Sequence, residues 1–181
     1  MILLTPWLTG NIILPDEINT VDAQGLPEDM NPKPSGSNVY ENTGTMAGFG
    51  YRRIDSQANE NGRDWIVEQL TSWGYDVERQ SFTTDECSNC QNIVATLPGL
   101  DDDSWIVVGS HHDAICYSPP PITGLTYPTC SSNGAYDDGT GVGATLELAR
   151  VMKLWQHTPE HTWKFAFWDY EEWQGSSSSE G

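Results

Sequence analysis

The stretch WIVVGSHHD, residues 105–113, combines an apolar run with polar side chains that follow it directly. A continuous apolar run bounded by turn residues is typical of a strand buried on both faces of a sheet. In α/β sheets, functional sites gather beyond the carboxyl ends of strands. His111 and Asp113 stand at such an end. The stretch therefore predicts both a buried strand and a site at the edge of its sheet.

The segments on either side extend this pattern to an α/β domain. Apolar residues recur at helical spacing in residues 61–74, with Asn61 as the expected N-cap, and residues 139–155 predict a second helix. Further strands are expected at residues 75–82, 92–99 and 162–168, and residues 101–104 are expected to form a solvated turn. The order of helices and strands predicts an α/β sandwich with a largely buried sheet.

The beginning of the chain differs from the rest in composition. Residues 1–50 are rich in Pro, Gly, Asn, Asp and Thr and show little periodicity, so we expect an irregular N-terminal segment there. The remainder, residues 51–181, is expected to fold as one domain, which suits the length of 181 residues.

The charge of the chain limits its partners and its surroundings. A formal net charge of −18 repels phosphate backbones and anionic membranes, so we expect no nucleic-acid partner. No run approaches the roughly 18 apolar residues that a membrane span needs. The acidic composition suits an extracellular medium, and we expect a secreted protein. The opening MILLTPWLTGNIILP lacks a basic region, so a signal peptide is expected to lie outside this chain.

The chain has four cysteines, Cys87, Cys90, Cys116 and Cys130. An even number of cysteines in an acidic chain favours disulfides over free thiols. The most local of the three pairings joins Cys87 to Cys90 and Cys116 to Cys130. A redox role or half a zinc site is the alternative for the single C-x-x-C, although no second C-x-x-C completes a zinc site.

Two more acidic clusters follow apolar segments or open a helix. The first is AYDDGTG at residues 135–141, and the second is the pair Glu171-Glu172 after the last strand. Each cluster alone is most simply a turn or a solvated strand end. Three such clusters in succession, counting His111 and Asp113, favour a metal site instead.

The spacing within the clusters suits metal chemistry. His111 and Asp113 are two residues apart, so in a continuing strand they share a face. One can ligate a metal while the other accepts the remaining ring N–H. Adjacent Glu171 and Glu172 would diverge, so that one coordinates metal and the other accepts a proton from the attacking water.

Three glycines enter the first turns of the helix expected at residues 139–155. Gly139, Gly141 and Gly143 each cost the helix about 0.5–1 kcal/mol relative to Ala. Something must therefore approach this backbone closely. Packing of the helix against the sheet and crowding around a bound metal are the two explanations.

As a set, these motifs resemble a known family. The order G-x-H-x-D, then G-A-x-D-D-G-x-G-V, then an apolar strand ending in E-E is similar to the co-catalytic di-zinc aminopeptidases, metallopeptidase family twenty-eight. The resemblance extends from about residue 50 to residue 175 and includes the stretches GYDVERQSF, QNIVATLPG and WIVVGSHHD. It implies a three-layer sandwich in which helices flank a mostly buried mixed β-sheet, here incomplete.

The resemblance also implies roles for five residues and a peptide substrate. His111 would ligate one zinc, Asp137 would bridge two zinc ions, and Glu172 would ligate the other ion. Glu171 would be the general base, and Asp113 would orient His111. The peptide bond between Asp137 and Asp138 would be cis. The reaction would be hydrolysis of a peptide bond near a free terminus, as in an aminopeptidase.

The sequence departs from the family after the E-E pair. The family uses a further Asp and a further His downstream, and this chain ends at Gly181 without them. His157 and His161 precede the last strand, roughly 20 Å from the expected site, so we reject them as substitutes. We therefore expect a C-terminally truncated part of the catalytic domain that binds zinc poorly and is inactive by itself.

Other functions remain open at this stage. Relatives with the same motifs include carboxypeptidases and glutaminyl cyclases, and a non-catalytic binding module could keep the same fold. The long loop at residues 114–133 is either a wall of the substrate pocket braced by Cys116–Cys130 or a neutral insertion. The oligomeric state is not predicted.

Overall fold

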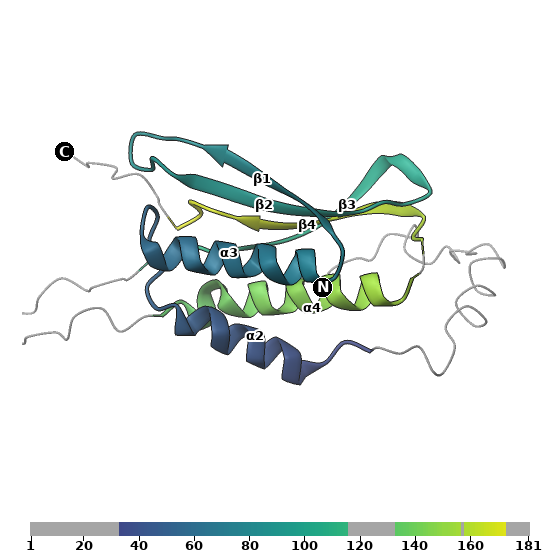
Figure 1. Cartoon of the computed structure of the whole chain (residues 1–181), viewed down its shortest axis with the longest axis horizontal. Coiled ribbons are helices and arrows are strands. Elements are labelled where there is room, and N and C mark those ends of the chain that lie inside the picture. Colours follow the sequence, from purple (N-terminus) through teal and green to yellow (C-terminus); the bar gives the residue numbers. More distant parts are fainter. Residues whose placement is uncertain (1–32, 116–132, 157, 173–181) are drawn as a thin grey trace, which may run out of the picture. The chain divides into compact units, whose positions relative to one another are not determined.

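A mixed four-stranded sheet is the centre of this computed structural model, which describes residues 33–115, 133–156 and 158–172 (Figure 1). The strands are β1 (Asp76–Phe82), β2 (Cys90–Leu97), β3 (Asp101–His111) and β4 (His161–Trp168). Their order is β1-β2-β4-β3. The β1–β2 and β2–β4 pairs are antiparallel, and β3 and β4 are parallel. The predicted α/β fold with a mixed sheet is confirmed.

The parallel pairing of β3 and β4 positions the site. In this register His111 at the end of β3 lies opposite Trp168 at the end of β4. Both strands therefore finish at the same edge of the sheet, and the residues after β4 emerge beside His111. The central strand β4 holds this register by burying Phe165, Ala166 and Phe167.

Strand β3 is not buried on both faces, contrary to the prediction. The side chains of Trp105 and Val107 are 61% and 54% exposed, because they point away from the helices and β3 is an edge strand of the described sheet. Residues 101–104, expected as a turn, form the start of β3, with a register shift between Asp101 and Trp105.

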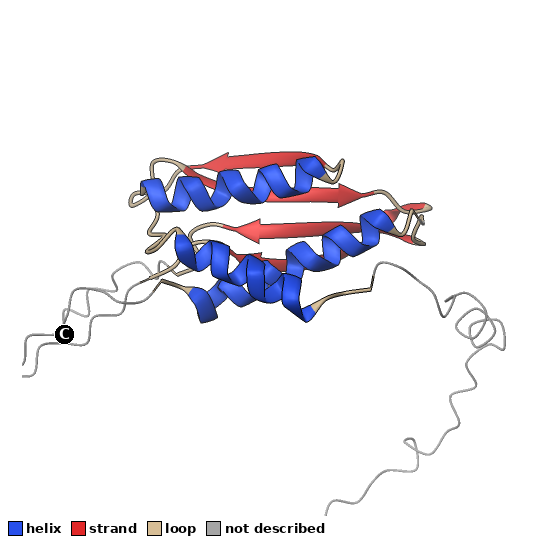
Figure 2. Cartoon of the chain, turned by 60° about the horizontal axis from the view of Figure 1, so that its bottom comes forward, coloured by secondary structure: helices blue, strands red, loops and turns tan. Residues whose placement is uncertain are grey.

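All three α-helices of the described residues cover the same face of the sheet. They are α2 (Gly36–Gly48), α3 (Gln57–Ser72) and α4 (Thr140–Leu154), and a short π-helix, η2 (Ala135–Gly139), precedes α4. Figure 1 shows the helices on one side of the strands, and Figure 2 shows them together in front of the sheet. In the described part of the chain, two of the three expected layers are therefore present.

Helix α3 begins earlier than predicted. Its N-cap is Ser56, whose hydroxyl accepts a hydrogen bond from the Asn59 amide at 3.2 Å. The expected N-cap, Asn61, lies inside the helix instead. Serine is among the best N-cap residues because its side-chain oxygen satisfies an amide that the first turn leaves unpaired.

The hydrophobic core lies between the sheet and the helices. Its fully buried side chains include Ile66 and Leu70 from α3, Leu146 from α4, and Ile93 and Phe165 from the sheet. Each such side chain contributes about 1.5–3 kcal/mol by leaving water. Burial of these apolar faces fixes the helices against the sheet.

Residues 36–48, which the composition predicts to be irregular, form α2. Met46 of this helix is fully buried in the core. Gly143 of α4 permits the close approach of α2, because a Cβ there would lie 2.7 Å from the carbonyl oxygen of Val39. The folded unit therefore begins at Pro34 instead of residue 51.

One predicted disulfide is present. Cys87, in the connection that follows β1, is bonded to Cys90, the first residue of β2, which confirms that pairing. The other expected pair, Cys116–Cys130, lies outside the described residues. Among the helices of the described residues, we find none with the length and apolar character of a membrane span.

Candidate metal centre

Three segments that are far apart in sequence meet at the edge of the sheet where β3 and β4 end. His111 ends β3, Asp137 belongs to η2, and Glu172 follows β4. Each offers one ligand atom, and these atoms all lie within 4.8 Å of one another. The parallel pairing of β3 and β4 brings His111 and Glu172 together, and η2 adds Asp137 from the helical layer.

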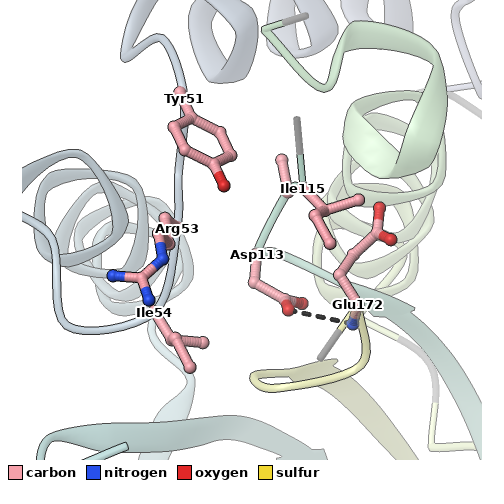
Figure 3. A pocket seen from close by; sticks show the side chains of 7 residues that line it. Tyr51, Arg53, Ile54, Asp113, Ile115 and Glu172 are labelled. Carbon is pink, nitrogen blue, oxygen red and sulfur yellow. Dashed lines mark hydrogen bonds between the residues drawn. The ribbon is translucent and has the colours of Figure 1, made fainter. Parts of the chain in front are cut away.

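The imidazole of His111 lies between two carboxylates. Its Nε2 atom is 3.0 Å from Oδ1 of Asp137, and its Nδ1 atom is 3.3 Å from Oδ1 of Asp113. The Asp113 side chain is buried, and its Oδ2 atom accepts a hydrogen bond from the main-chain amide of Glu172 at 3.1 Å (Figure 3). Asp113 thus connects the ring of His111 to the turn after β4.

The electrostatics of this cluster favour a cation. Burial alone would lower the pKa of His111, but the carboxylates of Asp113, Asp137 and Glu171 outweigh it and raise this pKa to about 9. Burial and the negative charge of Asp137 raise the pKa of Glu172. Crowded carboxylates repel one another unless a positive charge lies between them.

The two aspartates of η2 have different surroundings. The Asp137–Asp138 peptide bond is cis, as the family resemblance implies. The Asp137 side chain is 70% exposed and faces His111. The Asp138 carboxylate accepts a hydrogen bond from the Gly141 amide at 2.9 Å, so it serves the first turn of α4. Asp137 is therefore the aspartate available to a bound ion.

The glycines at the start of α4 have local explanations. A Cβ on Gly141 would overlap the carboxylate of Asp138, and one on Gly139 would lie 2.7 Å from the carbonyl oxygen of Gly134. Gly143 contacts α2, as described above. The close approaches thus come from α2 and from the η2 turn, and not from the sheet.

Both glutamates after β4 reach the cluster. Oε2 of Glu171 lies 3.6 Å from Nε2 of His111, while Glu172 supplies a candidate ligand atom to the same group. The alternation of strand β4 does not continue into this pair, because Tyr170 has a φ angle of +70° and turns the chain. The prediction that the side chains of Glu171 and Glu172 diverge assumed an extended chain here. The turn at Tyr170 removes that assumption.

Asp169, which no sequence motif predicted as a site residue, supports this turn. Its carboxylate is buried and accepts hydrogen bonds from the Asn59 side chain and the Gln91 amide, both at 3.0 Å. The guanidinium of Arg63 lies 3.7 Å away. An acidic residue directly after the apolar run FAFW is the sequence signal that could have identified it. Arg52, a fully buried arginine, was likewise not predicted from the sequence.

A small pocket lies beside the cluster. Figure 3 shows its lining, which includes Tyr51, Arg53, Ile54, Asp113, Ile115 and Glu172. A molecule bound next to Glu172 would meet this mixture of apolar, aromatic and charged side chains.

The two histidines rejected as ligands are not in the described cluster. His161 begins β4, at the opposite end of the strand from the cluster, and its Nδ1 atom lies 2.6 Å from the Ser104 hydroxyl. His157 lies outside the described residues.

A family model and several known proteins match this chain in sequence. The model of Peptidase family M28 matches residues 92–179. Leucine aminopeptidase 1 of Sclerotinia sclerotiorum is 31% identical over 72% of this chain and 32% of its own length. A probable zinc metalloprotease of Phaeosphaeria nodorum is 28% identical over 79% of this chain and 33% of its own length. The chain spans about one third of the length of these curated relatives.

Solved structures share the fold. A Zn-dependent exopeptidase from Parabacteroides distasonis aligns with a TM-score of 0.65 and 25% identity, over 78% of this chain and 49% of its own. Bacteroides thetaiotaomicron glutaminyl cyclase aligns with a TM-score of 0.69 and 22% identity, over 83% of this chain and 51% of its own. The described sheet and helices thus have the zinc-exopeptidase-like fold that the sequence predicts.

Proposed function

We propose that this protein is a zinc-dependent exopeptidase, most simply an aminopeptidase, on the premise that residues 92–179 match the model of Peptidase family M28. The observation that carries the proposal is the convergence of His111, Asp137 and Glu172 within 4.8 Å. One imidazole nitrogen and two carboxylate oxygens are ligand types that zinc prefers. The relatives named leucine aminopeptidase and zinc metalloprotease support the same conclusion.

The contacts of each residue suit a distinct role at a pair of zinc ions. His111 would ligate one ion through Nε2, Asp137 would bridge the two ions, and Glu172 would ligate the other. Asp113 faces the remaining ring nitrogen of His111 at 3.3 Å, where it can fix the tautomer and orientation of the ring.

When bound, zinc lowers the pKa of water and stabilises negative charge on the carbonyl oxygen of the peptide bond. The proton of the attacking water needs an acceptor, and Glu171 is our candidate for this general base. Its carboxylate is 57% exposed, and its Oε2 atom lies 3.6 Å from Nε2 of His111, so solvent water can approach it beside the cluster. It would accept the proton from water and deliver it to the leaving amine.

The charge around the cluster favours an amino terminus as the recognised end of the substrate. Asp137 and Glu172 are assigned to zinc, but the exposed carboxylate of Glu171 is not, and the chain carries a net charge of −18. Such a field attracts the ammonium group of a peptide and repels its carboxylate.

The proposal is tested by assaying the protein expressed from its complete reading frame with leucine p-nitroanilide. We expect hydrolysis that a zinc chelator abolishes and that added zinc restores. Turnover that persists after complete zinc removal would overturn the zinc assignment.

The same preparation distinguishes the alternative activities. A peptide with an N-terminal glutamine reports cyclisation, and an N-blocked peptide reports release of its C-terminal residue. Cyclisation without leucine p-nitroanilide hydrolysis would favour a glutaminyl cyclase, and C-terminal release alone would favour a carboxypeptidase. Zinc binding without any of these reactions would favour a binding module.

We also propose that the protein acts outside the cell. The Cys87–Cys90 disulfide supports this location, because structural disulfides persist mainly in oxidising compartments. Detection of the protein in the culture medium of its source cells would support secretion, and its retention in the cytosol would contradict it.

A further inference from the structure

Arg52 is fully buried, and its guanidinium donates hydrogen bonds to main-chain carbonyl groups of three separate segments. Nη1 donates to Met46 at the end of α2, at 2.9 Å, and Nε donates to His112 beyond β3, at 2.8 Å. In the segment that leads into η2, Nη1 donates to Asn133 at 2.7 Å and Nη2 donates to Gly134 at 3.0 Å.

These carbonyl groups flank the candidate metal ligands. His112 lies between His111 and Asp113, and Gly134 immediately precedes η2, which contains Asp137. The main-chain oxygen of Arg52 also accepts a hydrogen bond from the Ala114 amide at 3.1 Å. Arg52 therefore holds the segment after β3 with both its side chain and its main chain.

Gly134 lies in close contact with the guanidinium of Arg52. Gly134 has a φ angle of +60°, which favours glycine, and a Cβ there would lie 2.8 Å from Nη2 of Arg52. Its carbonyl oxygen also accepts a hydrogen bond from the Gly139 amide at 2.9 Å. One carbonyl group thus joins the guanidinium to the turn that carries Asp137.

The arrangement requires the shape of arginine as well as its charge. A guanidinium presents five N–H donors in a planar fork, whereas the ammonium of lysine is a single point at the end of its chain. A lysine could not reach carbonyl groups on all three segments at once. Removal of the fork would leave buried carbonyl oxygens without partners.

We propose that Arg52 is a positioning residue that sets the spacing between the His111 segment and the Asp137 segment. The proposal rests on the function proposed above, because its consequence is that metal affinity depends on the guanidinium of Arg52. Arg52 itself would touch neither metal nor substrate.

The first test is a Co²⁺ titration of the metal-free protein expressed from its complete reading frame, followed by the visible absorption of the bound ion. We expect the Arg52→Lys variant to bind Co²⁺ at least about tenfold more weakly, at a temperature where circular dichroism shows it folded. Arg79→Lys is the matched control. Arg79 lies on β1, at the edge of the described sheet, and forms an exposed ion pair with Asp64 of α3. Equal affinity of wild type and Arg52→Lys would overturn the proposal.

The second test is amide hydrogen exchange of the metal-free chain. In Arg52→Lys we expect the amides of Ala114 and Gly139 to exchange at least about tenfold faster, while the β1–β2 amides keep their protection. Unchanged exchange at both positions would overturn the proposal even if Co²⁺ binding falls. If wild type binds no Co²⁺, the proposed metal centre fails, and the exchange measurement still decides the role of Arg52.

A second variant covers the case in which Arg52→Lys does not fold. Gly134→Ala keeps the guanidinium but places a Cβ 2.8 Å from its Nη2 atom and 2.5 Å from the Cβ of Ala114, so we expect the same local increase in exchange and the same loss of Co²⁺ affinity. A Gly134→Ala chain that keeps wild-type exchange and affinity, or that loses protection uniformly, would contradict a specific positioning role.

Discussion

At the scale of single residues, Asp113 contacts two parts of the candidate metal centre. One of its oxygens faces the His111 ring, and the other accepts the Glu172 amide. Asp113 therefore contacts both the ring of His111 and the main chain of Glu172, and it can hold these two candidate ligands at a fixed separation without binding the ion itself. Asp113 is proposed to position His111 and Glu171 to accept a proton, so substitutions at the two residues should have different effects.

Replacing Asp113 with Asn should weaken zinc binding by about 10- to 100-fold, because Asn cannot carry the negative charge that orients the imidazole. The measurement is competition for zinc with a chromophoric chelator. Asp64→Asn, an exposed change on α3, is the control. Equal zinc affinity in the Asp113→Asn variant and the control would remove Asp113 from the centre.

Replacing Glu171 with Gln should lower kcat by about 10²- to 10⁴-fold in the active protein, because the proton acceptor is lost. Zinc content should stay at the wild-type level by atomic absorption. Glu172→Gln should instead lower the zinc content, because a ligand is lost. The reverse pattern would exchange the roles of the two glutamates.

At the scale of elements, a single carboxylate joins α2 to α4. Glu147 of α4 is buried and accepts hydrogen bonds from the Ser35 amide at 2.8 Å and the Asn38 side chain at 3.0 Å. Arg150 donates to the same carboxylate through two nitrogens at 2.7 Å. A negative charge at the N-terminus of α2 also complements the helix dipole.

Glu147→Gln should lower the free energy of unfolding by about 1–3 kcal/mol at neutral pH. Burial raises the pKa of Glu147, but the hydrogen bonds from Arg150, Asn38 and Ser35 outweigh burial and lower it. The stabilisation is therefore complete above the unfolded pKa of about 4.3 and is lost as the pH falls through the lower folded pKa. Urea unfolding of both chains between pH 3 and 7 should show their difference shrinking at the acid end. A constant difference would contradict this assignment.

The disulfide at the start of β2 closes a short ring, because Cys87 and Cys90 are only three positions apart. The loop-entropy relation gives about 2 kcal/mol for such a ring. We expect Cys87→Ser together with Cys90→Ser to lower the free energy of unfolding by about this amount in urea. Ser88→Ala keeps the ring, loses only the 3.1 Å hydrogen bond from the Ser88 hydroxyl to Asp55, and is the control. Equal stability of the double variant and wild type would contradict a structural role.

The elements also show where sequence patterns succeed and fail. Strands β2 and β4 were predictable because their apolar runs are continuous, and the end of β4 was marked by its acids. Helix α2 was missed because its sequence GSNVYENTGTMAG contains poor helix formers, and tertiary contacts through Met46 and Glu147 stabilise it instead. The partners of Arg52 are main-chain atoms of residues scattered from 46 to 134, which no local pattern reveals.

At the scale of the whole molecule, the face of the sheet opposite the helices exposes Trp105 and Val107 in the described part of the chain. Contiguous exposed apolar surface promotes association, and so does an edge strand. Val107→Glu places a carboxylate across from Lys164 in the β3–β4 register. We expect this change to reduce self-association in sedimentation experiments and to alter the free energy of unfolding by less than about 0.5 kcal/mol. Unchanged association would show that this face is not responsible.

Because β3 and β4 end in register, they also limit where this chain can gain or lose residues. Adding or deleting one residue within either strand would displace the end that leads to the candidate metal ligands by about 3.3 Å along the sheet and reverse which way each following side chain faces. Length changes should therefore be tolerated in the connections and rejected inside these two strands. In a library of single-codon insertions, functional clones should be absent from both.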